Sequence, residues 1–285
     1  MKRIGFIDYY IDEWHANNYP TWIRESSLAS KFEVALAWQE IAPPDKQSLE
    51  DWCHTQKVSK AGSIAEVVAE CDCLVVLSPD NAERHEDLSD LPLRSGKPVY
   101  IDKPIAPSLA EAQRMYAKAA QYHTPLISSS ALRYGSAIEN AVQQVAGSRV
   151  NYVATRGPGE WDTYAIHQLE MLVMLLGTGA KRMMQVGSAR ASLFVIDYGD
   201  GRRGSVNQIA EHPFQLTAQF GDDGQCLNID SMDDFFPRFI EAMLAFFDTG
   251  VVSIPKEQTL EIAALLEAGS AARKAPDTWV EVPAR

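Results

Sequence analysis

The sequence is poor in several features that would mark a specialised class of protein. It has four cysteines among 285 residues, at Cys53, Cys71, Cys73 and Cys226. Cys71 and Cys73 are one residue apart, which matches neither a zinc knuckle nor a CxxC redox pair. We expect all four to be reduced, structural thiols, as is usual in the cytosol.

Basic residues and long apolar runs are also scarce. Lys and Arg number 26 against 38 Asp and Glu, which gives a net charge of -12. This balance argues against nucleic acid or an anionic membrane as the main partner, since both attract basic patches. No apolar run approaches the roughly 20 residues that span a bilayer, and no basic leader with an apolar segment precedes the first expected strand. We therefore expect a cytoplasmic protein.

The composition, 46% hydrophobic and 22% charged, is that of an ordinary globular protein, long enough for two domains with separate cores. In the first 130 residues, short apolar runs alternate with helical stretches. The runs expected to be strands are Ile4–Ile7, Val34–Trp38, Leu74–Leu77, Val99–Ile101 and Leu126–Ser128. Such runs are typical of strands covered on both faces, so a doubly wound parallel sheet of the α/β class is predicted. Ser63 with Glu66, and Ser108 with Glu111, have the capping-box spacing that begins a helix.

After about residue 130 the pattern becomes that of an α+β domain with a mostly antiparallel sheet. The stretches expected to be strands are Val150–Arg156, Met183–Ser188, Ala191–Tyr198, Gly204–Ala210, Gln215–Phe220 and Cys226–Ile229. The segments YGDGRRG and GDDGQ have the composition of hairpin turns. Helices are expected at 163–176, ended by Gly177, and at 237–248 and 255–274, each of these two opening near a proline. The predicted domains are residues 1–130 and 131–285.

Three segments carry a resemblance to a known family. The first is CDCLVVLSPDNAERHEDL with LRSGKPVYIDKPIAPSLAEAQRM, where Asp102, Lys103 and Pro104 stand in place of a Glu-Lys-Pro motif. The second is WDTYAIHQLEMLVMLLG, and the third runs from FIEAMLAFF to TWVEV. In order and spacing they resemble the fourth and fifth strands, the active-site helix and the C-terminal helix pair of the glucose-fructose oxidoreductase / inositol dehydrogenase (Gfo/Idh/MocA) family. The resemblance covers nearly the whole chain.

The resemblance implies a Rossmann domain followed by an α+β domain, whose antiparallel sheet in such proteins commonly mediates homodimers or homotetramers. Family members usually transfer a hydride between NAD or NADP and a sugar, polyol or related hydroxy compound. The family's lysine falls on Lys103 and its helix histidine on His167, which are therefore the expected catalytic residues. The family's usual aspartate, four residues before the histidine, is replaced by Thr163.

The chemistry of Lys103 and His167 suits these roles. Lys103 follows the end of a strand, where ligands bind in doubly wound sheets, and its ammonium can hydrogen-bond a substrate hydroxyl or position the nicotinamide. Its alternative is a surface lysine before a turn-forming proline. His167 can take a hydroxyl proton, since imidazole is the usual base near neutral pH; its alternative is a histidine satisfied in a domain interface. Asp162 is rotated by about 100° from the position of Thr163, and is predicted to be the N-cap instead.

The turn after the first strand lacks the glycines of a dinucleotide-binding fold, which permit a tight turn and a close approach to the pyrophosphate. Asp8, Tyr10 and Glu13 stand about where those glycines would be. A carboxylate beside a phosphate at ~4 Å would cost on the order of 4 kcal/mol, so the usual cofactor pose is predicted to be blocked. The residues expected to line a cofactor in a modified pose are Asp8, Tyr10, Pro79 and Lys103.

Aromatic and polar side chains suggest another use of these regions, since rings and polar groups together recognise sugars. The candidate substrate contacts are Tyr9, Trp14, Arg133, Trp161 and Tyr164. The alternatives are that the aromatic residues fill the core or the space of the cofactor, and that the arginine forms an internal ion pair. Asp8, Asp12 and His15 match no metal motif, so no metal is expected.

Three functions stay open at this point. The first, preferred as a class, is NAD(P)-dependent oxidation or reduction of a sugar-like small molecule by Lys103 and His167. The second is a cofactor-free relative that binds a carbohydrate or metabolite as a sensor, carrier or assembly subunit, which the missing glycines and the displaced aspartate favour. The third is non-redox chemistry, such as isomerisation or elimination, at the same two residues.

Overall fold

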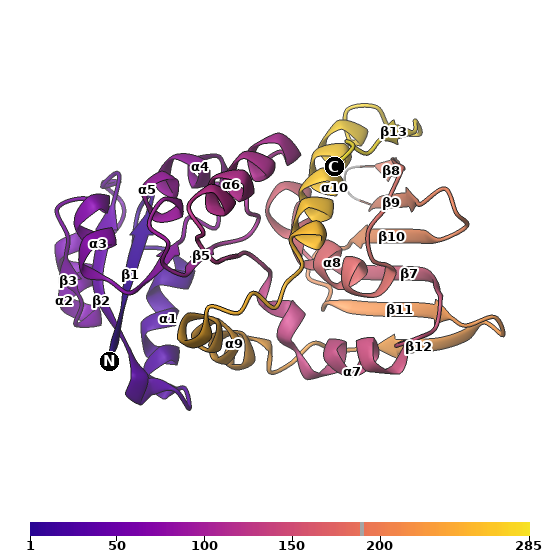
Figure 1. Cartoon of the computed structure of the whole chain (residues 1–285). Coiled ribbons are helices and arrows are strands. Elements are labelled where there is room, and N and C mark those ends of the chain that lie inside the picture. The colour runs from indigo at the N-terminus through magenta and orange to yellow at the C-terminus, as the bar shows by residue number, and fades with distance from the viewer. Residues whose placement is uncertain (189–190) are drawn as a thin grey trace. The chain divides into compact units, whose positions relative to one another are not determined.

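The computed structural model describes residues 1–188 and 191–285, and they divide into two compact units (Figure 1). The first unit comprises Met1–Ala106, Ala110–Ser129 and Ile240–Ile254. The second comprises Pro107–Leu109, Ser130–Phe239 and Pro255–Arg285. The predicted boundary near residue 130 does not describe this division completely, because the chain returns to the first unit at Ile240–Ile254.

The first unit is built on a six-stranded parallel sheet. Its strands are β1 (Lys2–Asp8), β2 (Phe32–Gln39), β3 (Ser59–Lys60), β4 (Cys73–Val76), β5 (Val99–Ile101) and β6 (Leu126–Ile127). Their order is β3-β2-β1-β4-β5-β6, which is the order of a dinucleotide-binding fold, with its switch point between β1 and β4. This confirms the predicted doubly wound sheet. The two-residue, exposed β3 was not predicted, because it has no apolar run.

Helices connect these strands. They are α1 (Trp14–Glu25), η1 (Ala29–Lys31), α2 (Leu49–Gln56), α3 (Ile64–Glu70), η2 (Ala82–Arg84), α4 (His85–Leu88), α5 (Asp90–Leu93) and α6 (Leu109–Gln121). At the start of α3, the Ser63 hydroxyl accepts a bond from the Glu66 N–H at 3.1 Å, as the capping box predicts. The Glu66 carboxylate accepts from the Gly62 N–H at 2.7 Å rather than from Ser63 itself. All four cysteines are free thiols, and Cys53, Cys71 and Cys73 are buried.

The second unit is built on a seven-stranded sheet. Its strands are β7 (Val150–Gly157), β8 (Arg182–Ser188), β9 (Ala191–Asp197), β10 (Arg203–Gln208), β11 (Gln215–Phe220), β12 (Gln225–Ile229) and β13 (Val280–Glu281). The order is β12-β11-β7-β10-β9-β8-β13. Only β7 and β10 pair in parallel, and the predicted hairpins β9–β10 and β11–β12 are both formed. The prediction of a mostly antiparallel sheet is therefore confirmed.

Helices cover this sheet and supply most of its core. They are η3 (Ala131–Tyr134), α7 (Ser136–Gln144), α8 (Trp161–Leu176), the start of α9 (Phe235–Thr249), and α10 (Lys256–Ala272). α8 and α10 pack together and contact strands β7, β8 and β10 (Figure 1). α8 ends at Gly177, whose φ of 72° favours glycine. Pro255 is the N-cap of α10, and α9 begins two residues before Pro237, so both helices open near the predicted prolines.

The second half of α9 belongs to the first unit. The Lys2 ammonium donates to the carbonyl oxygens of Phe247 and Asp248, each at 2.9 Å. Lys31 forms an ion pair with Asp248 at 2.6 Å. The beginning of β1 is thereby bonded to a segment about 245 residues further along the chain. Among the helices of residues 1–188 and 191–285, none has both the length and the apolar character to span a membrane.

Candidate functional site

In the turn between β1 and α1, the side chain of Glu13 bonds the backbone at the start of α1. Glu13 is the N-cap of α1 and is only 6% exposed. Its carboxylate accepts hydrogen bonds from the backbone N–H groups of His15, at 2.7 Å, and of Ala16. Its carbonyl accepts from the Asn17 N–H at 2.9 Å. The N–H groups that a helix N-terminus offers to an anion are therefore bonded to Glu13.

Other backbone donors of this turn also have partners within the first unit. The Tyr9 N–H donates to the Ser78 hydroxyl at 2.9 Å, and the Ile11 N–H to the Gln39 side-chain carbonyl at 3.0 Å. The Glu13 N–H donates to the Ile11 carbonyl at 2.8 Å. The turn is thus held from β1, from β2 and from the segment after β4.

Asp8 ends β1 at the switch point of the sheet. It is 1% exposed, and one of its oxygens accepts from the Ser78 hydroxyl at 2.7 Å, while the other, Oδ2, has no partner. Burial raises the pKa of Asp8 well above its ordinary value, and burial followed by the charge of Asp8 raises the pKa of Glu13 to about 8. Both shifts have the sign expected for carboxyl groups removed from water.

Asp102, which directly follows β5, is the third buried carboxylate of this region. It contacts the Nδ1 atom of His15, and accepts from the Tyr100 hydroxyl at 3.0 Å and the Lys103 N–H at 2.8 Å. Burial raises its pKa, but the opposing charge and hydrogen bond of His15, with the charge of Lys103, hold the pKa well below the usual range. The His15 ring stacks on Tyr19, with ring centroids 5.1 Å apart. Sequence reasoning considered His15 only as a metal ligand and missed this pair.

We define the turn cluster as Asp8, Glu13, His15, Ser78 and Asp102. The carboxyl ends of β1, β4 and β5, three adjacent strands, bring it together. Lys103 lies beside it and is largely buried, and its peptide bond to Pro104 is cis. Pro79, the next predicted cofactor residue, follows Ser78 and is buried.

A dinucleotide pyrophosphate does not fit this turn as it stands. In the usual pose, the phosphates accept bonds from the N–H groups that begin the helix. Here two of those groups are bonded to Glu13, and the adjoining carboxyl group of Asp8 is buried with one oxygen unpartnered.

The aromatic residues of the turn lie nearer the surface. Tyr9 and Tyr10 are half-buried, and Trp14 is 53% exposed. The Arg84 guanidinium lies 5.7 Å from the centre of the Tyr9 ring and forms an ion pair with Glu40, the residue after β2, at 2.8 Å. The predicted ligand contacts of Tyr9, Tyr10 and Trp14 remain predictions.

A second group of polar residues surrounds His167 on α8. His167 Nδ1 is 2.7 Å from the Ser130 hydroxyl oxygen, which also accepts from the Leu132 N–H at 3.1 Å. The rings of Tyr164 and Phe214 meet the imidazole edge-on, each with centroids 5.5 Å away. Tyr164 is 44% exposed, so its predicted contact with a substrate remains a prediction.

A buried ion pair supports this group. The Glu170 carboxylate, one turn after His167, accepts from the Ser130 N–H at 3.1 Å and pairs with the Arg133 guanidinium. Arg133 also donates to the Gln258 side chain at 2.8 Å. We define the α8 cluster as Ser130, Arg133, His167 and Glu170. The guanidinium of Arg133 is thus engaged internally, which favours the ion-pair alternative over a substrate contact.

Two predictions at the start of α8 are corrected. Trp161 is fully buried, its indole N–H donates to the Leu266 carbonyl at 3.1 Å, and its ring lies against Gly269, where a Cβ would be 1.9 Å away. It is a core residue and cannot stack on a sugar. Asp162 is not the N-cap: that position is Glu160, and Asp162 forms an ion pair with Arg273 at 2.7 Å. The distant partners Gly269 and Arg273, both near the end of the chain, decide these roles.

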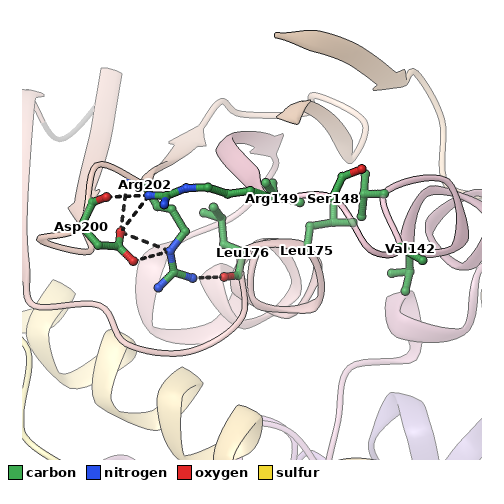
Figure 2. A pocket seen from close by; sticks show the side chains of 10 residues that line it. Val142, Ser148, Arg149, Leu175, Leu176, Asp200 and Arg202 are labelled. Carbon is green, nitrogen blue, oxygen red and sulfur yellow. Dashed lines mark hydrogen bonds and ion pairs between the residues drawn. The ribbon is translucent and has the colours of Figure 1, made fainter. Parts of the chain in front are cut away.

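A separate hollow lies beside the C-terminal end of α8 (Figure 2). Its volume is about 490 Å³, and its wall includes Arg149, Leu176, Asp200 and Arg202. Arg202 pairs with Asp200 at 2.9 Å and donates to the Leu176 carbonyl, so it caps the helix. None of the predicted site residues lines it. In residues 1–188 and 191–285, no three His, Cys, Asp or Glu side chains are grouped so that they could hold a metal ion.

The chain combines a parallel sheet of dinucleotide-binding order with a second, mostly antiparallel α+β unit. The family model described as "Oxidoreductase family, NAD-binding Rossmann fold" (GFO_IDH_MocA) matches residues 14–129. The match begins at the first residue of α1, so β1 and the turn lie outside it. Over these residues the match agrees with the Gfo/Idh/MocA resemblance of the sequence.

Solved structures share the fold along the whole chain. GenD2 from gentamicin A biosynthesis, in complex with NAD, is 13% identical with a TM-score of 0.80, over 100% of this chain and 97% of that one. Scyllo-inositol dehydrogenase from Lactobacillus casei, with NAD(H) and scyllo-inositol, is 15% identical with a TM-score of 0.78, over 99% of each. WlbA dehydrogenase from Bordetella pertussis, with NADH and UDP-GlcNAcA, is 14% identical with a TM-score of 0.76, over 99% of each. No curated protein matches the chain.

Proposed function

We propose that this chain is an oxidoreductase that transfers a hydride between NAD or NADP and a CH–OH group of a sugar, polyol or related hydroxy compound. The observation that carries the proposal is a sheet of dinucleotide-binding order with Lys103 at its carboxyl edge. Its strands β2 to β6 lie in the segment that matches an NAD-binding oxidoreductase family. The solved structures named above hold NAD(H), scyllo-inositol or UDP-GlcNAcA, which supports a sugar-like substrate.

His167 is the proposed acid–base group. Loss of a hydride from a CH–OH carbon requires that the hydroxyl proton also leave, and imidazole accepts protons near neutral pH. The Ser130 oxygen accepts from Leu132 N–H and has a second lone pair, so it can also accept from Nδ1–H of His167. In that tautomer Nε2 is the ring nitrogen with a lone pair, and we infer that the proton is transferred there. The buried Glu170–Arg133 pair holds Ser130 in place.

Lys103 is the proposed hydrogen-bond donor to the reacting oxygen. Lys103 is largely buried, and its positive charge helps to hold the adjacent Asp102 in the ionised form. A fixed cation stabilises an alkoxide better than a mobile one. A homodimer or homotetramer, a cytoplasmic location and the absence of nucleic-acid or membrane partners are further parts of the proposal.

Because the N–H groups that begin α1 are already bonded to Glu13, one alternative is favoured, a cofactor-free relative that binds a carbohydrate or metabolite. Calorimetric titration with NAD⁺, NADH, NADP⁺ and NADPH separates the two, after the preparation has been checked for a co-purified nucleotide. Micromolar binding of any of the four, followed by turnover of a sugar or inositol, supports the oxidoreductase. Absence of binding at millimolar concentration overturns it and leaves the cofactor-free relative.

A further inference from the structure

The turn cluster contains an unusual N-cap. Helix N-caps are usually Ser, Thr, Asp or Asn, whose short side chains reach the N–H groups of the second and third helical residues. In α1 the longer side chain of Glu13 does this, at His15 and Ala16, and it is buried while it does so. The two carboxyl oxygens of Glu13 accept from these N–H groups, as phosphate oxygens do when they bind at a helix N-terminus.

We propose that the Glu13 carboxylate is an internal substitute for the dinucleotide phosphate at the N-terminus of α1, so that this domain does not hold its ligand by a pyrophosphate. The proposal rests on the proposed function only for the identity of the ligand. The Glu13 side chain occupies the phosphate position in this sense: it bonds the N–H groups of His15 and Ala16, which a bound phosphate would need.

The surroundings of Glu13 keep it in this position. The Ser78 hydroxyl joins Asp8 to the Tyr9 N–H, so the start of the turn is fastened to the segment after β4. His15, whose N–H Glu13 accepts, is fastened through its ring to Asp102 after β5. Movement of Glu13 away from the helix would therefore leave two buried N–H groups without acceptors inside a turn that is bonded on both sides.

Two explanations of weak pyrophosphate binding can be separated at a pH above about 8, where the Glu13 carboxyl group is ionised. The carboxylate then both occupies the N–H donors and repels a phosphate. Glu13→Gln removes the charge and keeps an amide oxygen that can accept from His15 or Ala16. Glu13→Gly removes both, and glycine is an acceptable N-cap residue. Asp12→Asn is the matched control, because Asp12 lies in the same turn but bonds the Asn17 side chain and the Gln47 N–H instead of the start of α1.

The experiment is calorimetric titration of the full chain and these variants with ADP, which carries a pyrophosphate but no nicotinamide. We expect no binding by the unaltered chain below millimolar concentration. Glu13→Gly should gain on the order of tenfold or more per freed N–H donor, Glu13→Gln clearly less, and Asp12→Asn nothing. If Glu13→Gln and Glu13→Gly gained the same affinity for ADP, charge repulsion alone would explain the weak binding. The proposal that Glu13 occupies the N–H donors would then be overturned. Micromolar ADP binding by the unaltered chain would overturn the proposal outright.

A second measurement covers the case in which Glu13→Gly does not fold. Amide hydrogen exchange of the unaltered chain should show protection at His15 and Ala16, and Glu13→Ser, which keeps a short N-cap acceptor, should lose protection at one of them. Rapid exchange of both amides in the unaltered chain would contradict the proposal. Binding of NAD⁺ without binding of ADP would leave both this proposal and the oxidoreductase standing. If the unaltered chain bound neither NAD⁺ nor ADP but Glu13→Gly gained ADP binding, only the proposed oxidoreductase function would be contradicted.

Discussion

The turn cluster and the α8 cluster are both polar and built around a histidine, but they differ in burial and in charge balance. The turn cluster is buried throughout, whereas Arg133 and His167 of the α8 cluster are partly exposed. In the α8 cluster one carboxylate, Glu170, meets one guanidinium, Arg133. In the turn cluster three carboxyl groups share one histidine, and burial raises the pKa of Asp8 and Glu13. The balanced pair holds Ser130, the hydrogen-bond partner of His167, in place. An excess of buried carboxyl groups instead makes stability depend on pH and disfavours a phosphate nearby.

The largest effect should follow from loss of the imidazole in the α8 cluster. We expect His167→Gln to lower kcat/KM for the sugar substrate by a factor on the order of 10² to 10⁴, the usual contribution of a positioned acid–base group. His212→Gln, in the loop after β10, is the control and should leave kcat/KM unchanged. Turnover within a few-fold of the unaltered chain would place the acid–base group elsewhere.

Removal of one partner from the balanced pair should cost stability. Glu170→Ala leaves the Arg133 guanidinium buried without its counter-ion, and we expect the free energy of unfolding to fall by about 3–5 kcal/mol. Urea denaturation measures this. The double variant Glu170→Leu with Arg133→Met should recover most of the loss, because two apolar side chains need no counter-ion. A double variant as unstable as Glu170→Ala would show that packing rather than charge is responsible.

The unbalanced cluster should give the protein a stability that falls as the pH rises. The pKa of Glu13 is about 8 in the folded chain against an ordinary 4.5, so the folded state holds this proton more tightly than the unfolded state does. Its contribution is complete below pH 4.5 and is lost as the pH rises through about 8. Glu13→Gln should therefore show a smaller decline between these values in urea denaturation. An identical decline in both proteins would contradict the burial of an ionisable Glu13.

The smallest effect is expected at the exposed end of α8. Asp162 pairs with Arg273 at the surface, and exposed pairs contribute roughly 0.2–1 kcal/mol. Asp162→Asn should change the free energy of unfolding by no more than this, and less at high salt because the pair is screened. A loss as large as that of Glu170→Ala would mean that Asp162 has a structural role beyond the ion pair.

The sequence predicted the elements far better than the roles of side chains. Apolar runs located β1, β4 and β5 to within a residue or two, because strands buried on both faces need continuous apolar residues. The resemblance located Lys103 and His167, and their roles remain predictions. Side-chain partners were not predictable from local pattern: Trp161 meets Gly269 about 108 residues later, and Arg133 meets Glu170 37 residues later.

Glu13 illustrates the same limit at short range. Its charge and its place in the turn were visible in the sequence and predicted a poor phosphate site. The hydrogen bonds from the N–H groups of His15 and Ala16 to its carboxylate were not predictable. Glutamate is not a usual N-cap, and these bonds depend on the backbone conformation of the turn.

The bonds from Lys2 to Phe247 and Asp248 have a consequence for the order of folding. The six-stranded sheet is complete in sequence by Ile127, yet its unit includes Ile240–Ile254. During synthesis from the N-terminus, about 110 residues of a different unit must emerge before this segment can dock. Contacts of such long sequence separation slow folding. A fragment that ends near residue 130 lacks this segment, so the parallel sheet depends for its completion on chain made much later.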